Sequence, residues 1–77
     1  MKPGNMVKLR LKLKELSLRS EDGNYNYKIE TWFHTEIGFV LKKKVIKINS
    51  SLNLIDVLIY ISDGKVGWVY ARDLEVI

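Results

Sequence analysis

The side chains that enzymes use most often for chemistry are sparse and scattered along this sequence. His34 is the only histidine and there is no cysteine, so the set of ligands that a zinc site needs is missing. The nine Asp and Glu residues are dispersed, and no pair is indicated that could work across a cleft as general acid and base. No nucleophile elbow or glycine-rich phosphate loop is present. We therefore expect no catalytic residue, no metal site and no cofactor, which leaves binding as the activity to explain.

Basic residues form the first candidate for a binding site. In one segment they alternate with apolar residues, and they recur in a second run: Lys8, Arg10, Lys12 and Lys14, then Lys42, Lys43, Lys44 and Lys47. A strand would place successive cations of the first row about 6.6–7 Å apart on one face. Phosphates in a nucleic acid have a comparable spacing, so the row could follow a polyanion, and the second run could join it if the strands pair. The alternative is a solvated face whose charges prevent aggregation at a sheet edge.

Aromatic residues form the second candidate. A group in the middle of the chain could stack on bases or line a protein interface: Tyr25, Tyr27, Trp32, Phe33 and His34. The alternative is that the tyrosines face the core and that Trp32 covers one end of it. Trp68 and Tyr70 share one face of a strand, and Val69 on the other face is the better core candidate. We therefore expect Trp68 and Tyr70 to be partly exposed.

Length and composition limit the class of protein. Residues 1–77 make a single domain, with 47% hydrophobic and 29% charged residues, and so small a core favours a partner or self-association. Residues 1–48 hold eleven Lys and Arg against five acids, a net charge of +6, whereas residues 49–77 have a net charge of −2. No signal peptide is indicated, and the most apolar run, residues 52–61, is too short to cross a bilayer. The expected location is cytoplasmic or inside an assembled particle, without a membrane partner.

Short alternating segments separated by turn residues predict an all-β fold of five to six antiparallel strands closed into a small barrel. We expect the first strand at residues 7–14, with a bulge near Leu16, and a loop at residues 20–24. Further strands follow at residues 25–33, 37–48 and 57–61, with a bend at Gly38 and a hairpin connection at residues 49–53. Asp63-Gly64 predicts a two-residue turn in which both residues have positive φ. After the return strand at residues 66–70 we expect a 3₁₀ turn at residues 71–73 and a last short strand.

The C-terminal residues 63–77, DGKVGWVYARDLEVI, resemble the end of an SH3 domain, where a tight distal turn leads into a Gly-aromatic-aliphatic strand, a 3₁₀ turn and a final strand. Residues 3–7 similarly look like the opening of bacterial SH3-like, KOW-like and Tudor-like barrels, and residues 36–41 like their second strand. The pattern is also similar to short SH3-like proteins encoded by tailed bacteriophages. The resemblance implies a small SH3-like barrel, and it covers about half of the chain.

This sequence departs from the SH3 domains that bind proline-rich peptides. It has no Ala-Leu-Tyr-Asp-Tyr segment, and Tyr60 with aliphatic neighbours stands where a tryptophan would precede the distal turn. Tyr70 and Leu74 replace the proline and the tyrosine of the 3₁₀ turn. Because recognition of a proline helix needs an aromatic groove, we do not expect that activity.

We expect a non-enzymatic module that contacts a protein partner or takes part in assembly. Its contact surface would be formed by aromatic residues with a basic rim: Trp32, Tyr60, Trp68 and Tyr70. The alternative is a nucleic-acid-binding barrel that uses the row from Lys8 to Lys14 and the cluster at residues 42–47. The sequence leaves open whether the two basic groups share a face.

Overall fold

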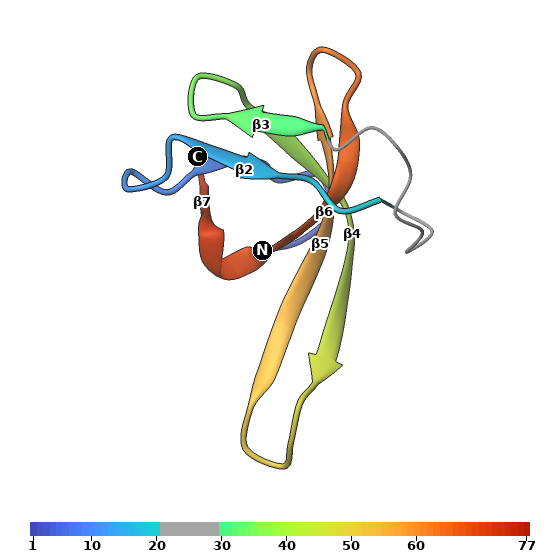
Figure 1. Cartoon of the computed structure of the whole chain (residues 1–77). Coiled ribbons are helices and arrows are strands. Elements are labelled where there is room, and N and C mark those ends of the chain that lie inside the picture. Colours follow the sequence, from blue (N-terminus) through green and yellow to red (C-terminus); the bar gives the residue numbers. More distant parts are fainter. Residues whose placement is uncertain (21–29) are drawn as a thin grey trace.

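The computed structural model is an all-β protein with a five-stranded antiparallel sheet and a separate two-stranded sheet (Figure 1), which confirms the predicted class. It describes residues 1–20 and 30–77. The large sheet has the order β6-β5-β4-β1-β7 and contains β1 (Met6–Leu9), β4 (Gly38–Lys47), β5 (Asn53–Ile61), β6 (Val66–Tyr70) and β7 (Leu74–Val76). The small sheet pairs β2 (Glu15–Ser17) with β3 (Thr31–Phe33), and the 3₁₀ helix η1 (Ala71–Asp73) joins β6 to β7. Most of the expected loop at residues 20–24, and residues 25–29 of the expected strand, lie outside the described residues.

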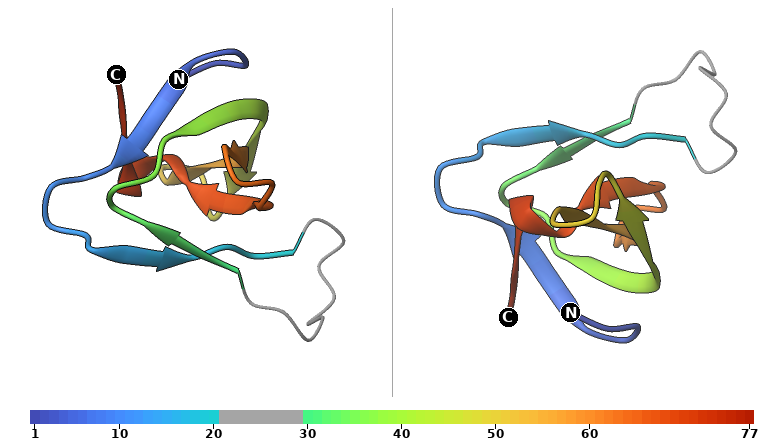
Figure 2. Two further views of the ribbon diagram at one scale, coloured as in Figure 1. Left: turned by 90° about the horizontal axis from the view of Figure 1, so that it is seen from above. Right: turned by 90° about the horizontal axis from the view of Figure 1, so that it is seen from below.

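Within residues 1–20 and 30–77 the two sheets do not close into a barrel, so that part of the prediction is wrong. In the described part of the chain, β2 and β3 pair with each other over three residue pairs. One isolated bridge, Arg19 to Trp68, joins the segment after β2 to the outer edge of β6. Figure 2 shows the β2–β3 pair lying beside the large sheet. The small sheet therefore covers one side of the large sheet and does not continue its ladder.

Apolar side chains from both sheets meet in a single core. Its buried members are Val7, Leu9, Leu18, Trp32, Val40, Val57, Ile59, Ile61, Val69 and Leu74. The core is dense where Trp32 of β3 reaches the large sheet: a Cβ on Gly38 would lie 2.6 Å from Cγ2 of Ile59 and 3.0 Å from the Trp32 ring. The glycine that suggested a bend is thus required by close packing. The bend itself lies at Leu41, because Val40 pairs with Ile59 and Lys42 with Leu58, which leaves Leu41 as the extra residue of a bulge.

The first strand is shorter than predicted. β1 ends at Leu9, and Leu11, expected on the core face, is 88% exposed. The reason is the length of the neighbouring strand: Leu9 pairs with Leu74, the first residue of β7 after η1, so the ladder has no further partner. The Arg10 amide donates to the Asp73 carbonyl at 3.1 Å, and the chain then turns, with the Leu13 amide donating to the Arg10 carbonyl at 2.8 Å.

The hairpin between β5 and β6 has a different turn from the one predicted. Gly64 has φ of +100°, but none of the described non-glycine residues, Asp63 included, has positive φ. The Gly64 amide donates to the Ile61 carbonyl at 2.8 Å, and the Ile61 amide donates to the Lys65 carbonyl at 2.8 Å. These bonds define a three-residue loop in which the glycine takes the left-handed conformation. The hairpin and the 3₁₀ turn at residues 71–73 lie where the sequence predicted them.

The glycine of β6 allows us to test the contact between the two sheets. A Cβ on Gly67 would lie 2.5 Å from Cβ of Leu18 and 2.8 Å from the Arg19 carbonyl oxygen. Because backbone must move to make room, we expect Gly67→Ala to lower the free energy of unfolding by about 1–3 kcal/mol. Urea denaturation measures this, with Ser50→Ala on the exposed tip of the β4–β5 hairpin as the control. An unchanged midpoint for Gly67→Ala would contradict the close passage of residues 18–19 over β6.

Candidate functional site

One face of the large sheet carries three of the four aromatic residues that were expected to form the contact surface: Tyr60, Trp68 and Tyr70. Partners in an antiparallel ladder point their side chains to the same side. The register therefore aligns Lys42, Leu58 and Trp68 in one row, and Lys44, Asp56 and Tyr70 in the next. Tyr60 follows in the neighbouring row. We call this surface the outer face, and its members are Lys42, Lys44, Asp56, Leu58, Tyr60, Trp68 and Tyr70. The opposite side of the same strands carries core residues.

Trp68 and Tyr70 are half-buried while Val69 between them is buried, as the sequence predicted. Basic groups lie over both rings. Lys44 Nζ lies 4.7 Å from the centre of the Trp68 ring, and Arg19 Cζ lies 4.2 Å from the centre of the Tyr70 ring. Arg72 Cζ lies 5.2 Å from that same Tyr70 ring. Cations at these distances are attracted by the negative faces of the rings. The outer face thus presents aromatic rings and positive charges together.

The one acid of the outer face is already neutralised. Asp56 is 1% exposed and forms an ion pair with the guanidinium of Arg19, whose side chain is 44% exposed. Arg19 therefore has two roles: it compensates a buried carboxylate, which would be costly without a partner, and it stacks on Tyr70. Sequence reasoning did not select Arg19, Asp56 or Arg72. A signal was available for one of them, because Asp56 is the only charged residue between positions 52 and 61.

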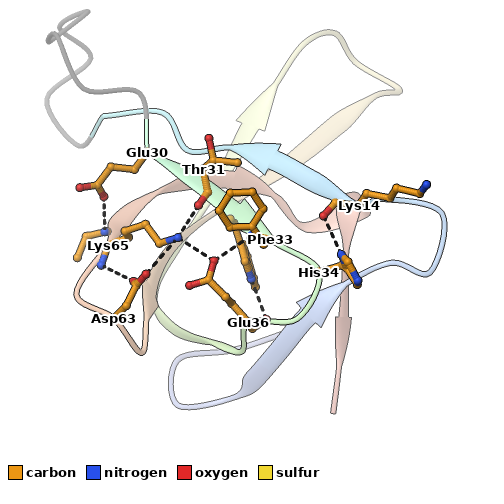
Figure 3. Close-up of polar contacts among 10 residues, drawn as sticks. Lys14, Glu30, Thr31, Phe33, His34, Glu36, Asp63 and Lys65 are labelled. Atoms are coloured by element: carbon orange, nitrogen blue, oxygen red, sulfur yellow. Dashed lines mark hydrogen bonds and ion pairs between the residues drawn. The ribbon is translucent and has the colours of Figure 1, made fainter.

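A second polar cluster joins the β5–β6 hairpin to the turn between β3 and β4 (Figure 3). Lys65 Nζ donates to the Thr31 carbonyl at 2.6 Å and pairs with Glu36 Oε1 at 2.7 Å and Asp63 Oδ2 at 3.2 Å. The hydrogen bond that Lys65 donates to the Glu36 carboxylate is the largest influence on the pKa of Lys65, which is raised. Desolvation opposes ionisation of Asp63, but its hydrogen bonds with Lys65 prevail and lower its pKa. The contacts of Lys65 with Thr31, Glu36 and Asp63 hold the two turns together.

The predicted site residues do not all lie on one surface. Trp32 is fully buried, and its Nε1 donates to the Glu36 carbonyl at 2.9 Å, so its place in a contact surface is wrong. Tyr60, 40% exposed, shares the outer face with Trp68 and Tyr70. Tyr25 and Tyr27 lie outside the described residues. Phe33 is exposed on the small sheet, 5.1 Å from Lys65 Nζ.

The basic row from position 8 to 14 does not lie on one strand. Lys8 is half-buried in β1 opposite Glu75 of β7. The other three members are exposed in the turn after β1 or just before β2: Arg10, Lys12 and Lys14. Within the second run, Lys42 and Lys44 lie on the outer face, whereas Lys43 points to the opposite side because side chains alternate along a strand. The prediction that these basic residues form one row on a single strand face is therefore wrong.

His34 lies in the turn that follows β3. It is exposed, and its Nδ1 lies 3.1 Å from the Lys14 carbonyl oxygen. Across residues 1–20 and 30–77, no three potential ligands from His, Cys, Asp and Glu are grouped closely enough to hold a metal ion. The same residues include no helix with the length and hydrophobicity required to traverse a membrane.

No family model, curated protein or solved structure matches this chain. The function is therefore argued from the outer face and its surroundings.

Arg19 and Asp56 provide a test of the pairing that supports the outer face. Arg19→Met leaves a buried carboxylate without its partner, and breaking a buried pair costs about 3–5 kcal/mol. Because Arg19 is partly solvated, we expect a loss near the lower end of that range. The double variant Arg19→Met/Asp56→Leu should recover much of the loss, since no charge is then left buried. Chemical denaturation of the four proteins measures the coupling, and additive effects would contradict the ion pair.

Lys65 provides a pH-dependent test. The folded-state pKa of Asp63 lies below its ordinary value of 3.8, so Asp63 stabilises the fold above that pH and loses this contribution as the pH falls through its folded pKa. Lys65→Met removes the side-chain hydrogen bond and the positive charge that lower the pKa of Asp63, and it leaves the hydrogen bond from the Lys65 amide in place. We expect the Tm of this variant to fall less than that of the parent protein when the pH is lowered below about 4. Lys12→Met, an exposed lysine, is the control, and equal acid sensitivity in all three proteins would contradict the cluster.

Proposed function

We propose that this chain is a non-enzymatic SH3-like binding module whose outer face contacts a partner protein, in a complex or in an assembled particle. The observation that carries the proposal is the placement of Trp68 and Tyr70, both half-exposed, on one side of β6, with exposed Tyr60 in the neighbouring row. Large aromatic residues account for much of the binding energy at protein interfaces. Here they also require no rearrangement of the core, because Val69 fills the inner side of the same strand.

Charge on the outer face indicates the chemistry of the partner. Lys42 and Lys44 are exposed, Arg72 is exposed beside Tyr70, and Arg19 keeps 44% of its side chain in contact with solvent. Asp56 is buried and offsets the charge of Arg19, which leaves the charges of Lys42, Lys44 and Arg72 for an incoming ligand. Complementary charge guides encounter and excludes wrong partners. We therefore propose a partner that presents acidic side chains around an apolar centre.

The order of the last elements supports the SH3-like assignment within this proposal. The distal hairpin, β6, η1 and β7 follow one another as the resemblance implies, and β7 returns to pair with β1. The departures from proline-binding SH3 domains have a structural counterpart. Leu74, at the position of their tyrosine, is 2% exposed and belongs to the core. The proposal accordingly excludes proline-rich peptides, and it places the protein in the cytoplasm or in a particle, since a chain without cysteine needs no oxidising compartment.

Nucleic-acid binding is the second candidate function. It no longer rests on the row from Lys8 to Lys14, which the turn after β1 disperses. Two observations favour it: basic groups stack on the half-buried rings of Trp68 and Tyr70, and residues 42–55 of the β4–β5 hairpin carry four lysines without an acid. Aromatic rings beside basic groups also bind the bases and phosphates of single strands.

Selection of peptides tests the protein-binding proposal. The immobilised full chain is screened against random dodecapeptides, and fluorescence anisotropy gives the affinity of the selected peptides. We expect acidic peptides with apolar residues, and we expect Trp68→Ala to weaken their binding about 30-fold, the scale of an interface hot spot of about 2 kcal/mol. Phe33→Ala, which removes an exposed ring from the other sheet, is the matched control. Selected peptides that bind both variants equally well would contradict the assignment of the outer face.

A further inference from the structure

The β4–β5 hairpin extends beyond the rest of the sheet (Figure 1). The pairing of β4 with β1 ends at Phe39, and the pairing of β5 with β6 ends where Asp56 meets Tyr70. In the register of the described strands, the strand residues among 42–55 therefore pair only between β4 and β5. Lys42–Lys44 lie opposite the part of β5 that also pairs with β6. We call residues 42–55 the arm. None of its residues belongs to the buried core cluster, so the arm is not needed to form that core.

The arm is positively charged along its length. It contains Lys42, Lys43, Lys44 and Lys47, all exposed, and no Asp or Glu. Lys42–Lys44 lie at its base and Lys47 lies close to its tip. Because side chains alternate, the lysines point to both sides of the ribbon. The charge of the arm equals the net charge of +4 of the whole chain, so the remainder of the protein is neutral in sum.

Between the lysines, the arm exposes apolar and uncharged polar side chains. Val45 and Ile55 face each other across the ladder, 53% and 41% exposed. Ile48 and Leu52 flank the tip and are also exposed. The tip itself consists of Asn49, Ser50 and Ser51. A second copy of the chain is a poor occupant for the β4 edge of the arm, because pairing two such edges would bring lysine-rich strands together, and like charges opposite each other destabilise a ladder.

We propose that the arm enters the major groove of duplex DNA. This rests on the second candidate function and specifies the form of nucleic acid and the element that binds it. The major groove is about 12 Å wide and about 8.5 Å deep and admits a two-stranded ribbon. Beyond Lys44 the ladder continues for three residues on β4, which at about 3.3 Å per residue reaches about 10 Å. The tip can thus reach the base edges while Lys42–Lys44 remain level with the phosphates.

The side chains of the arm match the two parts of the groove that they would reach, the phosphates at its rim and the base edges at its floor. Lysines at the base neutralise backbone phosphates, which supplies affinity without sequence specificity. Nearer the tip, exposed Val45, Ile48 and Leu52 match the methyl groups of thymine, and Ser and Asn side chains can hydrogen-bond to base edges or phosphates. Duplex RNA presents a deep, narrow major groove that side chains cannot read. The arm is therefore expected to favour duplex DNA over duplex RNA.

Fluorescence anisotropy with labelled duplex DNA, duplex RNA and single-stranded DNA of equal length tests the proposal over a range of salt concentrations. The test variant carries Lys42→Gln, Lys43→Gln, Lys44→Gln and Lys47→Gln. Since each phosphate contact contributes about 0.9 to the slope of log K against log salt, we expect the slope for duplex DNA to fall by roughly 3–4. The control removes the same charge elsewhere, at exposed positions: Lys2→Gln, Arg10→Gln, Lys12→Gln and Lys14→Gln. Its slope should match that of the parent protein.

A second variant tests whether binding requires the arm itself or only the lysines at its base. Residues 45–55 are replaced by Asn-Gly, which joins Lys44 to Asp56 across the existing ladder and keeps the three lysines at the base. This variant should remain folded by circular dichroism, because it retains every buried core residue, and it should lose the preference for duplex DNA over duplex RNA. Absence of binding to any oligonucleotide at about 50 mM salt would overturn both the arm and the second candidate function. Binding that survives both arm variants would overturn the arm alone.

Discussion

The passage of residues 18–19 over β6 is the contact on which both the core and the outer face depend. The Arg19 amide donates to the Trp68 carbonyl at 3.1 Å, and the Trp68 amide donates to the Arg19 carbonyl at 2.8 Å. Gly67 permits this approach, since a Cβ there would lie 2.5 Å from Cβ of Leu18. The crossing places Leu18 in the core and carries Arg19 around the strand edge to Asp56 and Tyr70. One backbone contact therefore fixes a core residue and a surface cation together.

As a result, the two sides of β5 and β6 lie in different environments. On the inner side, Val57, Ile59 and Val69 fill the core. On the outer side, Leu58 is buried outside that core cluster, in the row between Lys42 and Trp68. A sheet covered on one face would ordinarily present polar side chains on the other. Here the second face keeps aromatic rings and balances its buried carboxylate with Arg19, which is a costly arrangement for a surface that makes no contacts.

Local sequence patterns were sufficient where neighbouring residues decide the structure. The apolar run in β5, the alternation around Val69 and the 3₁₀ turn at Ala71–Asp73 were all predicted, because each depends on residues adjacent in sequence. The end of β1 was not, because it depends on where β7 begins, more than sixty residues later. Burial of Trp32 depends on the space beside Gly38. The Arg19–Asp56 pair joins positions 37 residues apart, and no local pattern records such a contact. Sequence reasoning thus selected Tyr60, Trp68 and Tyr70 and the lysines Lys42 and Lys44, which share one face. It wrongly included Trp32, which is buried, and it missed Arg19 and Arg72.

Lys44 links the outer face to the arm. Its ammonium group lies over the Trp68 ring, and its backbone lies at the point where the arm leaves the sheet. A cation–π contact at an exposed site contributes about 0.5–1 kcal/mol, whereas a hydrogen bond to a charged group contributes about 1.5–3 kcal/mol. A phosphate or carboxylate near Lys44 therefore competes successfully with the ring. Once Lys44 turns to the anion, one face of Trp68 becomes available for a base or an apolar side chain. Through this one residue, occupation of the arm would be coupled to exposure of the aromatic surface, so the two proposed binding surfaces would not be independent.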